Sequence, residues 1–421
     1  MARNMKDSGI EWIGEIPEGW TKNKVIRLFD TIGSGTTPKN ITSDFPVVNW
    51  IQFGDITGSF MPTCKNVISA NLLSQYSALK VYPAPFIIIA MYGASVGNAS
   101  ISLIDGCVNQ ACCVLFSPSC NLHYAFYVIK SAQSYLIRKA VGGGQPNISQ
   151  ETIKQLWLPL PPLSTQDIIV RNLDATCSKI DDLLISVRSS IEEYKKLKQA
   201  VITQAVTKTI YDDFGNPSKF RKLRSLCDVL SKGTTPKDIE TQNDEFYCIR
   251  YLKSENIVSN QLNLNPTFFI TAETNNSLER SKLNSGDILF VIAGASIGKV
   301  AITTADFLPA NTNQAVAFIR LSSSYQYATK YIWYFLQSDV VKQLIALSSV
   351  QSAQPNLSLE DLGAMRLPLP DQMGCLKITD YLDAKCAEID KLIAKKEQLV
   401  KELESYKKSL IYEVVTGKRE V

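Results

Sequence analysis

The chain has 421 residues, of which 45% are apolar and 20% are charged, and its formal net charge is +4. These values predict roughly two to four folded domains and exclude disorder as the dominant state. The longest apolar run, residues 83–92, is about half of what spans a bilayer, and the polar N-terminus carries no signal-peptide core. We therefore expect a soluble, cytoplasmic protein with no membrane partner.

The sequence repeats itself at an interval of about 200 residues, and such a repeat indicates two copies of one architecture. The first part of each copy keeps short motifs while its loops change length, whereas the second part, about 60 residues, aligns without a gap. The repeated motifs are GTTPK (Gly35–Lys39 and Gly233–Lys237), GASVGN and GASIGK (Gly93 and Gly294), NQA (Asn109–Ala111 and Asn313–Ala315), and QPNIS and QPNLS (Gln145–Ser149 and Gln354–Ser358).

The first part of each copy has the pattern of a mixed α/β domain. Continuous apolar runs predict buried strands at 86–91 and 111–116 in the first copy, and at 288–292 and 315–321 in the second. Helical apolar spacing follows at 122–140 and at 325–347. The second of these helices carries an aromatic stripe, Tyr331, Trp333, Tyr334 and Phe335, which we interpret as core rather than as a platform for stacking bases.

The second part of each copy has apolar residues in steps of four and three, which predicts a long helix of about four heptads. Two such helices in one chain can bury each other's stripe, and a two-fold relation would make them antiparallel. The predicted seam is Ile180, Leu184, Val187, Ile191, Tyr194 and Val201 in one helix, with Ile389, Ile393, Val400, Leu403, Leu410 and Val414 in the other. We expect Leu184 and Val187 near Leu410 and Val414, and Ile393 near Val201 and Ala205. The alternative is that each helix packs on its own globular domain.

The predicted fold is α+β: two mixed α/β domains, related by a pseudo-two-fold axis, are separated by an antiparallel coiled coil of two long helices. The expected boundaries are 1–150 for the first domain, 151–210 for the first helix, 211–355 for the second domain and 356–421 for the second helix.

The residues that enzymes require are missing from the expected places. GASIGK is one residue short of a phosphate-binding loop, and its counterpart has no lysine. No dinucleotide turn, amino-methyltransferase motif or acidic nuclease cluster is present. The ten cysteines contain no Cys-x-x-Cys pair, which is typical of reduced cytosolic thiols. A histidine site would have to use His123, which we expect to be a packed or surface residue. We therefore predict a non-catalytic binder with no catalytic residue, no metal site and no cofactor of its own.

Two similar but non-identical domains on a rigid spacer suit a duplex that is read at two different half-sites. The chain resembles the DNA-specificity subunit (HsdS) of type I restriction-modification systems. The resemblance rests on DSGIEWIGEIPEGW at residues 7–20, on the duplicated GTTPK, GAS and NQA motifs, and on the two junctions that run from QPN to LPLP. One departure is MGC at 373–375, where the first copy has LSTQ, and it leaves the start of the second helix open.

The resemblance implies that each variable segment is a target recognition domain for double-stranded DNA, and that the helices dock two methyltransferase subunits. Those partners would bind S-adenosylmethionine and methylate adenine at N6. Motor-nuclease subunits would add restriction that depends on ATP and Mg²⁺. Three other interpretations stay open: the specificity subunit of a type IIB enzyme, a coiled-coil scaffold that binds no DNA, and an enzyme in its own right.

Candidate DNA contacts lie at the repeated loop positions. Threonines and lysines suit the phosphate backbone, and amide side chains suit adenine edges. GTTPK is equally compatible with a proline-stabilised turn, and the NQA amides with internal caps. We expect Gly93, Gly97, Gly294 and Gly298 to serve tight turns. The candidates are Thr36, Thr37, Lys39, Asn98, Asn109 and Gln110 in the first copy, and Thr234, Thr235, Lys237, Arg250, Lys253, Lys299, Asn313 and Gln314 in the second.

Overall fold

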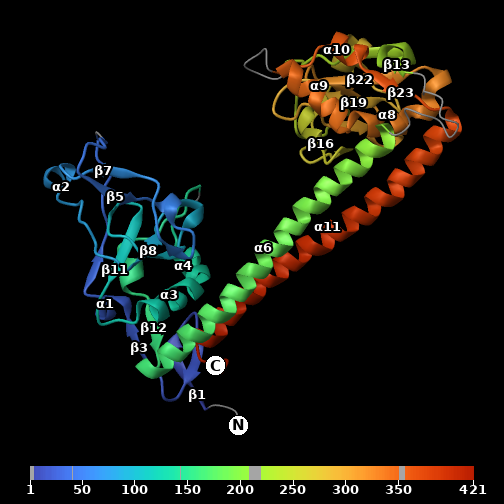
Figure 1. Ribbon diagram of the computed structural model, residues 1–421. Coiled ribbons are helices and arrows are strands. Elements are labelled where there is room, and N and C mark those ends of the chain that lie inside the picture. The colour runs from blue at the N-terminus through green and yellow to red at the C-terminus, as the bar shows by residue number, and fades with distance from the viewer. Residues whose placement is uncertain (1–3, 40, 143, 208–219, 350–355) are drawn as a thin grey trace. The chain divides into compact units, whose positions relative to one another are not determined.

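The computed structural model describes residues 4–39, 41–142, 144–207, 220–349 and 356–421 (Figure 1). The chain forms two compact units. Unit 1 is Met1–Val187 with Leu399–Val421, and unit 2 is Arg188–Gln398. Each unit therefore combines a globular part with one half of each of two long helices. The predicted boundaries at 210/211 and near 355 fall outside the described residues.

The globular part of unit 1 is a mixed α/β domain built on a five-stranded sheet. Its strands are β1 (Met5–Ile10), β2 (Gly14–Pro17), β3 (Thr21–Lys24), β4 (Thr31–Gly33), β5 (Val47–Ile51), β6 (Phe60–Met61), β7 (Val67–Ser69), β8 (Phe86–Ala90), β9 (Ala99–Ser102), β10 (Cys107–Val108), β11 (Cys112–Phe116) and β12 (Trp157–Leu160). Its helices are α1 (Val25–Leu28), α2 (Leu72–Gln75), α3 (Leu122–Ser131), α4 (Gln133–Lys139) and α5 (Gln150–Lys154). The central sheet has the order β4-β11-β8-β9-β6, and a smaller sheet has the order β10-β5-β7.

Unit 2 repeats this topology. Its strands are β13 (Phe220–Lys222), β14 (Cys227–Lys232), β15 (Ile249–Leu252), β16 (Ile257–Val258), β17 (Gln261–Leu262), β18 (Phe269–Ile270), β19 (Ile288–Val291), β20 (Val300–Ile302), β21 (Ala310–Thr312), β22 (Val316–Leu321) and β23 (Arg366–Pro368). Its helices are α7 (Ala272–Ser277), α8 (Thr329–Leu336), α9 (Asp339–Ser349) and α10 (Leu359–Ala364). The four-stranded order β14-β22-β19-β20 matches β4-β11-β8-β9 of unit 1, whose fifth strand is β6, and β18-β15-β21 matches β7-β5-β10. The sequence repeat is therefore also a structural repeat.

Alternation along the central strands divides each core into two layers. In unit 1, Ile87 and Ile89 pack with the α3 and α4 side chains, whereas Ile88 faces the smaller sheet and packs with Ile51. Successive strand residues point to opposite faces, so a strand that is apolar throughout is covered on both sides. In unit 2, Phe290 packs toward the helices and Leu289 toward the smaller sheet in the same way. The buried strands predicted from the sequence are therefore confirmed.

Each helix predicted after these strands is interrupted. In unit 1 the segment 122–140 forms α3 and α4 with a break at Ala132, and in unit 2 the segment 325–347 is divided between α8 and α9 after an initial 3₁₀ helix. The aromatic stripe is core, as predicted: Tyr331, Tyr334 and Phe335 are buried and Trp333 is half-buried.

The QPN junctions begin short helices. The Ser149 side chain accepts a hydrogen bond from the Thr152 backbone amide at the start of α5, and Ser358 caps α10 through Asp361 in the same way. A serine in this position satisfies an amide that would otherwise have no partner. The LPLP segments that follow pair as β12 with β3 and as β23 with β13. The junctions therefore return the chain to its domain before each long helix starts.

The long helices are α6 (Leu163–Thr207) and α11 (Gln372–Val415). They start at equivalent positions of the repeat, so the MGC segment does not shift the second start. At 45 and 44 residues they are longer than the four heptads predicted, about 28 residues, because each also packs on its own domain. Leu173 of α6 lies in the unit 1 core, and Leu382 of α11 lies in the unit 2 core. The sequence left open whether the two helices pack on each other or each on its own globular domain. In the structure each helix does both.

The two helices run antiparallel within each unit. In unit 1 the Tyr124 hydroxyl donates to the carbonyl oxygens of Pro159, just before α6, and of Val415, at the end of α11. Further along, Lys407 Nζ lies 2.5 Å from Asp181 Oδ1. Each predicted seam residue is buried or half-buried. Buried are Ile180, Leu184, Ile191, Ile389, Leu410 and Val414, and half-buried are Val187, Tyr194, Val201, Ile393, Val400 and Leu403.

The register of the helices differs from the predicted one. With Asp181 opposite Lys407, the antiparallel register places Leu184 opposite residue 404 of α11. Leu410 is six residues further along that helix, which is about 9 Å along the axis. In unit 2, Lys198 pairs with Asp390, which puts Ile393 six residues short of Val201. The other expected partners, Val187, Val414 and Ala205, are further apart still. The prediction was wrong because a heptad pattern defines the apolar stripe but not which turn of one helix faces which turn of the other.

Candidate nucleic-acid interface

The GTTPK loop and the NQA turn meet in unit 1. Gly35 packs directly on β10, where an added Cβ would lie 1.6 Å from the carbonyl oxygen of Val108. The Thr37 hydroxyl donates to Gln110 Oε1 at 2.6 Å, and the Ser34 hydroxyl lies 3.4 Å from the Gln110 carbonyl oxygen. Only glycine allows this backbone approach, which explains why both copies begin the loop with it. Two motifs that are 70 residues apart in the sequence thus form one polar surface.

Unit 2 forms the same junction, but the tyrosine that holds the loop comes from a different position of the repeat. A Cβ on Gly233 would lie 1.8 Å from the carbonyl oxygen of Thr312, the residue before the second NQA turn. The Tyr251 hydroxyl donates to the Thr234 carbonyl at 2.8 Å, and in unit 1 the Tyr82 hydroxyl donates to the Ser34 carbonyl at 3.2 Å. Burial raises the pKa of Tyr251 to about 12 and also raises that of Tyr82, so both hydroxyls stay protonated donors even in mildly alkaline solution.

Several predicted contact residues face solvent. Lys39, Lys237 and Lys299 are exposed, and among the described residues they have no carboxylate partner. A free ammonium group on a loop suits a phosphate. Thr36 is half-buried. The other exposed candidates are Thr37, Gln110, Thr234, Thr235 and Gln314.

Two of the three candidate asparagines form side-chain hydrogen bonds within the fold. Asn109 is 7% exposed, and its Oδ1 accepts from the Ala111 amide at 3.1 Å, so it caps the turn. Asn98 Nδ2 donates to the Ile56 carbonyl at 2.9 Å. The Oδ1 of Asn313 is buried without a hydrogen-bond partner in the structure. The internal-cap interpretation therefore fits Asn109 better than base reading.

Two positively charged candidate side chains of unit 2, Arg250 and Lys253, already make contacts within the protein. Arg250 is half-buried and donates to the Asp306 carbonyl at 2.8 Å. Lys253 Nζ lies 3.5 Å from the centre of the Phe268 ring and 3.9 Å from Glu255 Oε1. Each could reach a phosphate only by giving up these contacts. Their role as DNA contacts stays a prediction.

The glycine turns match the prediction. Gly93, Gly97, Gly294 and Gly298 all have positive φ, between 72° and 86°, and a side chain would be strained in this conformation. The GAS motifs thus shape tight turns, in agreement with their failure to match a phosphate-binding loop.

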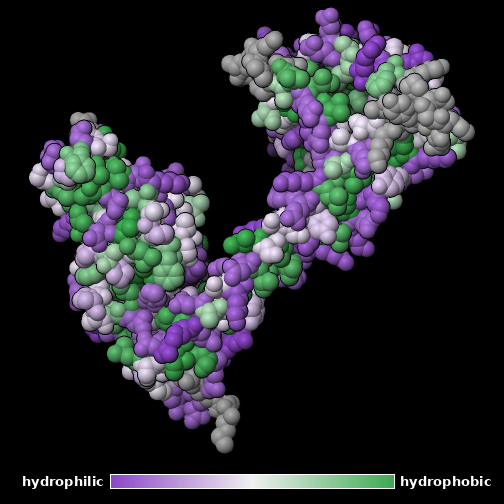
Figure 2. Space-filling model, viewed as in Figure 1, coloured by the Kyte–Doolittle hydropathy of each residue, from purple (hydrophilic) through white to green (hydrophobic). Residues whose placement is uncertain are grey.

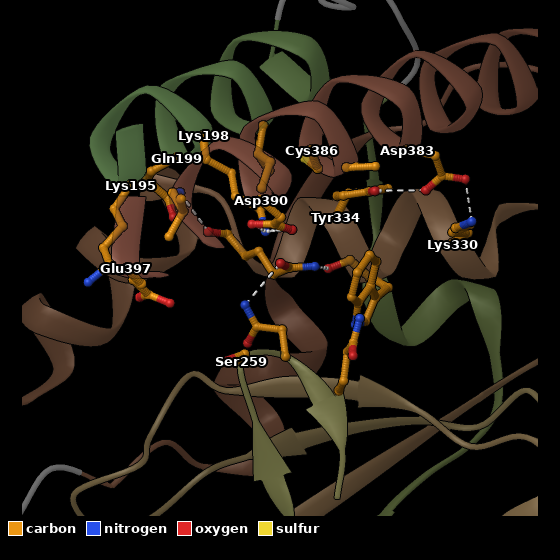
Figure 3. Close-up of a pocket in the computed structure, with 17 residues that line it drawn as sticks. Lys195, Lys198, Gln199, Ser259, Lys330, Tyr334, Asp383, Cys386, Asp390 and Glu397 are labelled. Carbon is orange, nitrogen blue, oxygen red and sulfur yellow. Dashed lines mark hydrogen bonds and ion pairs between the residues drawn. The ribbon is translucent and has the colours of Figure 1, made fainter. Parts of the chain in front are cut away.

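A charged junction joins α8 to the long helices in unit 2 (Figure 3). The Tyr334 hydroxyl donates to Asp383 Oδ1 at 2.8 Å, and Lys330 pairs with the same carboxylate. A cavity of about 760 Å³ lies beside them, and Gln261 and Trp333 are among its lining residues. Two of its lining lysines, Lys198 and Lys330, pair with the lining carboxylates Asp390 and Asp383.

Unit 1 builds the equivalent junction around its single histidine. The Tyr127 hydroxyl donates to Asp174 at 2.6 Å, and His123 Nδ1 lies 4.0 Å from the same carboxylate. The Phe60 ring, at the repeat position of Gln261, packs against the His123 ring with centroids 5.1 Å apart. His123 is therefore a half-buried packing residue, as predicted.

The comparison with protein families decides the assignment. A family model described as the Type I restriction modification DNA specificity domain matches residues 17–192 and 216–402, so each match covers one globular part and much of the following helix. The chain belongs to this family of DNA specificity subunits. The two matches coincide with the two copies of the repeat.

Specificity subunits from other organisms are similar along most of the chain. The type I restriction enzyme EcoBI specificity subunit of Escherichia coli is 26% identical over 359 residues, which are 78% of this chain and 74% of that protein. The MjaVIII specificity subunit of Methanocaldococcus jannaschii is 25% identical over 308 residues, with 70% and 69% covered.

Two solved structures show the same fold. One, from work entitled "Structural basis underlying complex assembly and conformational transition of the type I R-M system", has a TM-score of 0.72 at 15% identity and covers 95% of this chain and 98% of its own. The HsdS subunit from Thermoanaerobacter tengcongensis has a TM-score of 0.50 at 16% identity, with 96% and 98% covered. The mixed α/β domains with long helices are therefore the HsdS fold.

Sequence reasoning missed the residues that hold the loops. Tyr82 and Tyr251 both donate to a GTTPK loop, but they do not occupy equivalent positions of the repeat, so the repeat gave no signal for them.

Among the described residues, no group of three His, Cys, Asp or Glu side chains is placed to hold a metal ion. All ten cysteines are free thiols. None of the described helices is long and apolar enough to cross a membrane.

Proposed function

We propose that this chain is the sequence-reading, non-catalytic subunit of a type I restriction-modification complex, and that each unit reads one half of an asymmetric two-part DNA target. The observation that carries the proposal is the duplicated junction of the GTTPK loop and the NQA turn. Its scaffold is the same in both units, with a glycine on the backbone and a tyrosine holding the loop. Its exposed motif residues are of the same types in both units, since Thr37, Lys39 and Gln110 correspond to Thr235, Lys237 and Gln314, and they suit contacts common to both half-sites. The loops that connect the motifs differ in length and sequence, as those of two domains that read different bases would.

Membership of the specificity family supports the rest of the proposal. The long helices would dock two methyltransferase subunits, and motor-nuclease subunits would join that complex. S-adenosylmethionine, ATP and Mg²⁺ would be held by these partners. The helix pair has apolar side chains available for docking: Leu183, Ile185 and Tyr406 of unit 1 are 52%, 65% and 47% exposed. Figure 2 shows apolar patches that interrupt the mainly hydrophilic surface of the helices. Exposed apolar patches of this kind mark protein interfaces.

Charge reversal on the loops tests the DNA contact. Lys39→Glu combined with Lys237→Glu, in the complex with its methyltransferase, should weaken binding to target DNA and lower the salt dependence of binding. Removing one lysine–phosphate pair reduces the slope of log K against log salt by about one. The matched control is Arg27→Glu with Lys222→Glu, which makes the same charge change at exposed residues of α1 and β13. Equal affinity and equal slope for the two double variants would refute the loop assignment.

A further inference from the structure

Two phenylalanines are exposed at equivalent positions of the repeat. Phe45 is 88% exposed and Phe246 is 73% exposed, which makes them the two most exposed large apolar side chains of the described residues. They lie 201 residues apart, the same interval that relates Val47–Ile51 to the strand residues of unit 2. Full burial of a phenylalanine is worth about 1.5–3 kcal/mol, so a loop gains no stability from leaving the ring in water.

The backbone around each ring is held in place while the ring stays free. In unit 1, the carbonyls of Thr42 and Pro46 on either side of Phe45 accept hydrogen bonds from Ser69 and Ala70 at 2.8 and 2.7 Å. The loop is thus fastened to the end of β7. Because hydrogen bonds hold the loop on both sides of the ring, the ring is presented in one place, and binding costs little conformational entropy of the loop.

The unit 2 loop is held by another set of bonds. Asp244 Oδ1 accepts from the backbone amides of Phe246 and Tyr247, at 2.8 and 2.6 Å. Glu240 exchanges two backbone hydrogen bonds with Phe269 on β18, the counterpart of β7. The two units therefore use different bonds to present the same side chain at the same place.

Each ring shares its loop with a candidate phosphate contact. Phe45 follows Lys39 in the connection from β4 to β5, and Phe246 follows Lys237 in the connection from β14 to β15. A carboxylate precedes each ring, Asp44 in one copy and Glu245 in the other. DNA phosphates repel a carboxylate, so the loop tip suits a DNA groove, which is lined by base edges, better than it suits the sugar-phosphate backbone. The lysine can then hold the backbone beside it.

A residue that both domains share has a different role from a residue that differs between them. Domains that read different half-sites differ in their base-reading side chains, so a shared residue either supports the fold or makes a contact common to both half-sites. An exposed ring does not support the fold. Apolar side chains on DNA-binding loops wedge between base pairs of any sequence and partly unstack them.

We propose that Phe45 and Phe246 are apolar wedges, each of which inserts against a base step of its own half-site. This inference rests on the proposed function and adds to it a contact that is independent of sequence. The alternative is that the rings contact a protein partner, and measuring base unstacking and complex assembly separately distinguishes a DNA contact from a protein contact.

The test uses the complete complex and a duplex that carries its target, with 2-aminopurine placed in turn at each position except the methylated adenines. Those adenines are left out because their extrusion by the methyltransferase would itself raise the fluorescence. The wild-type complex should raise the fluorescence at one step in each half-site. Phe45→Ala should abolish the signal in one half-site only, and Phe246→Ala in the other only. Each should weaken binding on the order of tenfold.

Leucine variants and a distant control sharpen the result. Phe45→Leu and Phe246→Leu keep an apolar wedge and should retain most of the signal, and Val141→Ala, an exposed side chain elsewhere in unit 1, should change nothing. Alanine variants that bind and unstack like wild type would overturn the wedge and leave the proposed function intact. Weaker assembly with the methyltransferase, with the unstacking unchanged, would assign the rings to a protein contact and would also overturn it. A wild-type complex that binds no duplex would overturn the proposed function as well.

Discussion

Gly35→Ala is the substitution that tests most sharply how the unit 1 reading surface is built. The new Cβ would lie 1.6 Å from the Val108 carbonyl oxygen and 2.6 Å from its carbon, which is about half a normal contact distance for the oxygen. Val108 is fully buried and pairs with β5, so it cannot retreat. The GTTPK loop must therefore move outward, and the hydrogen bond from Thr37 to Gln110 must break.

The expected cost is that of overpacking, about 1–3 kcal/mol. For a unit of this size that lowers the melting temperature by roughly 2–12 °C. The control is Gly54→Ala, because Gly54 has no atom within 4 Å of an added Cβ and no positive φ. Differential scanning calorimetry gives the stability, and a binding titration of the complex gives the loss of affinity for target DNA. If Gly35→Ala melts and binds like Gly54→Ala, the close approach that we use to explain the repeated glycine is wrong.

Two further predictions concern the helix pair and its junction with α8. Reversing Lys407 to Asp should destabilise the chain by at most about 1 kcal/mol, because the pair is partly exposed, and adding Asp181→Lys should restore most of the loss in a thermal melt if the observed register is right. Burial and the hydrogen bond to Asp383 raise the pKa of Tyr334, so above about pH 10 the unfolded chain releases a proton that the folded chain keeps, and stability falls as the pH rises. Tyr334→Phe should therefore lose less stability between pH 9 and pH 11 than wild type does in urea titrations, and an equal loss would contradict this.

The repeat made the fold predictable to an unusual degree. Two copies in one chain separate what geometry requires from what varies, so the strands at 86–91 and 288–292 and the two long helices could be placed without other sequences. The helix register could not be predicted, because heptads recur every seven residues and the charged pairs found in the observed register, such as Lys198 with Asp390, resemble ordinary surface charges in the sequence.

The candidate site was predicted less completely than the fold. The GTTPK and NQA motifs do meet, but their meeting depends on the approach of Gly35 to β10, which no spacing in the sequence reveals. Asn109 has the side chain of a base reader and the position of a turn cap, and only its burial distinguishes the two roles. Phe45 was overlooked because one phenylalanine in a polar loop carries no pattern until its exposure is known.

The most direct test of the central claim is to sequence, by a single-molecule method that detects methylated bases, DNA from cells that express this chain with its methyltransferase and from cells that lack only this chain. We predict methylated adenines in an asymmetric two-part motif in the first sample and their complete loss in the second. The absence of such a motif, while the same methyltransferase paired with another specificity subunit methylates that subunit's target, would contradict the proposed DNA-reading role of this chain.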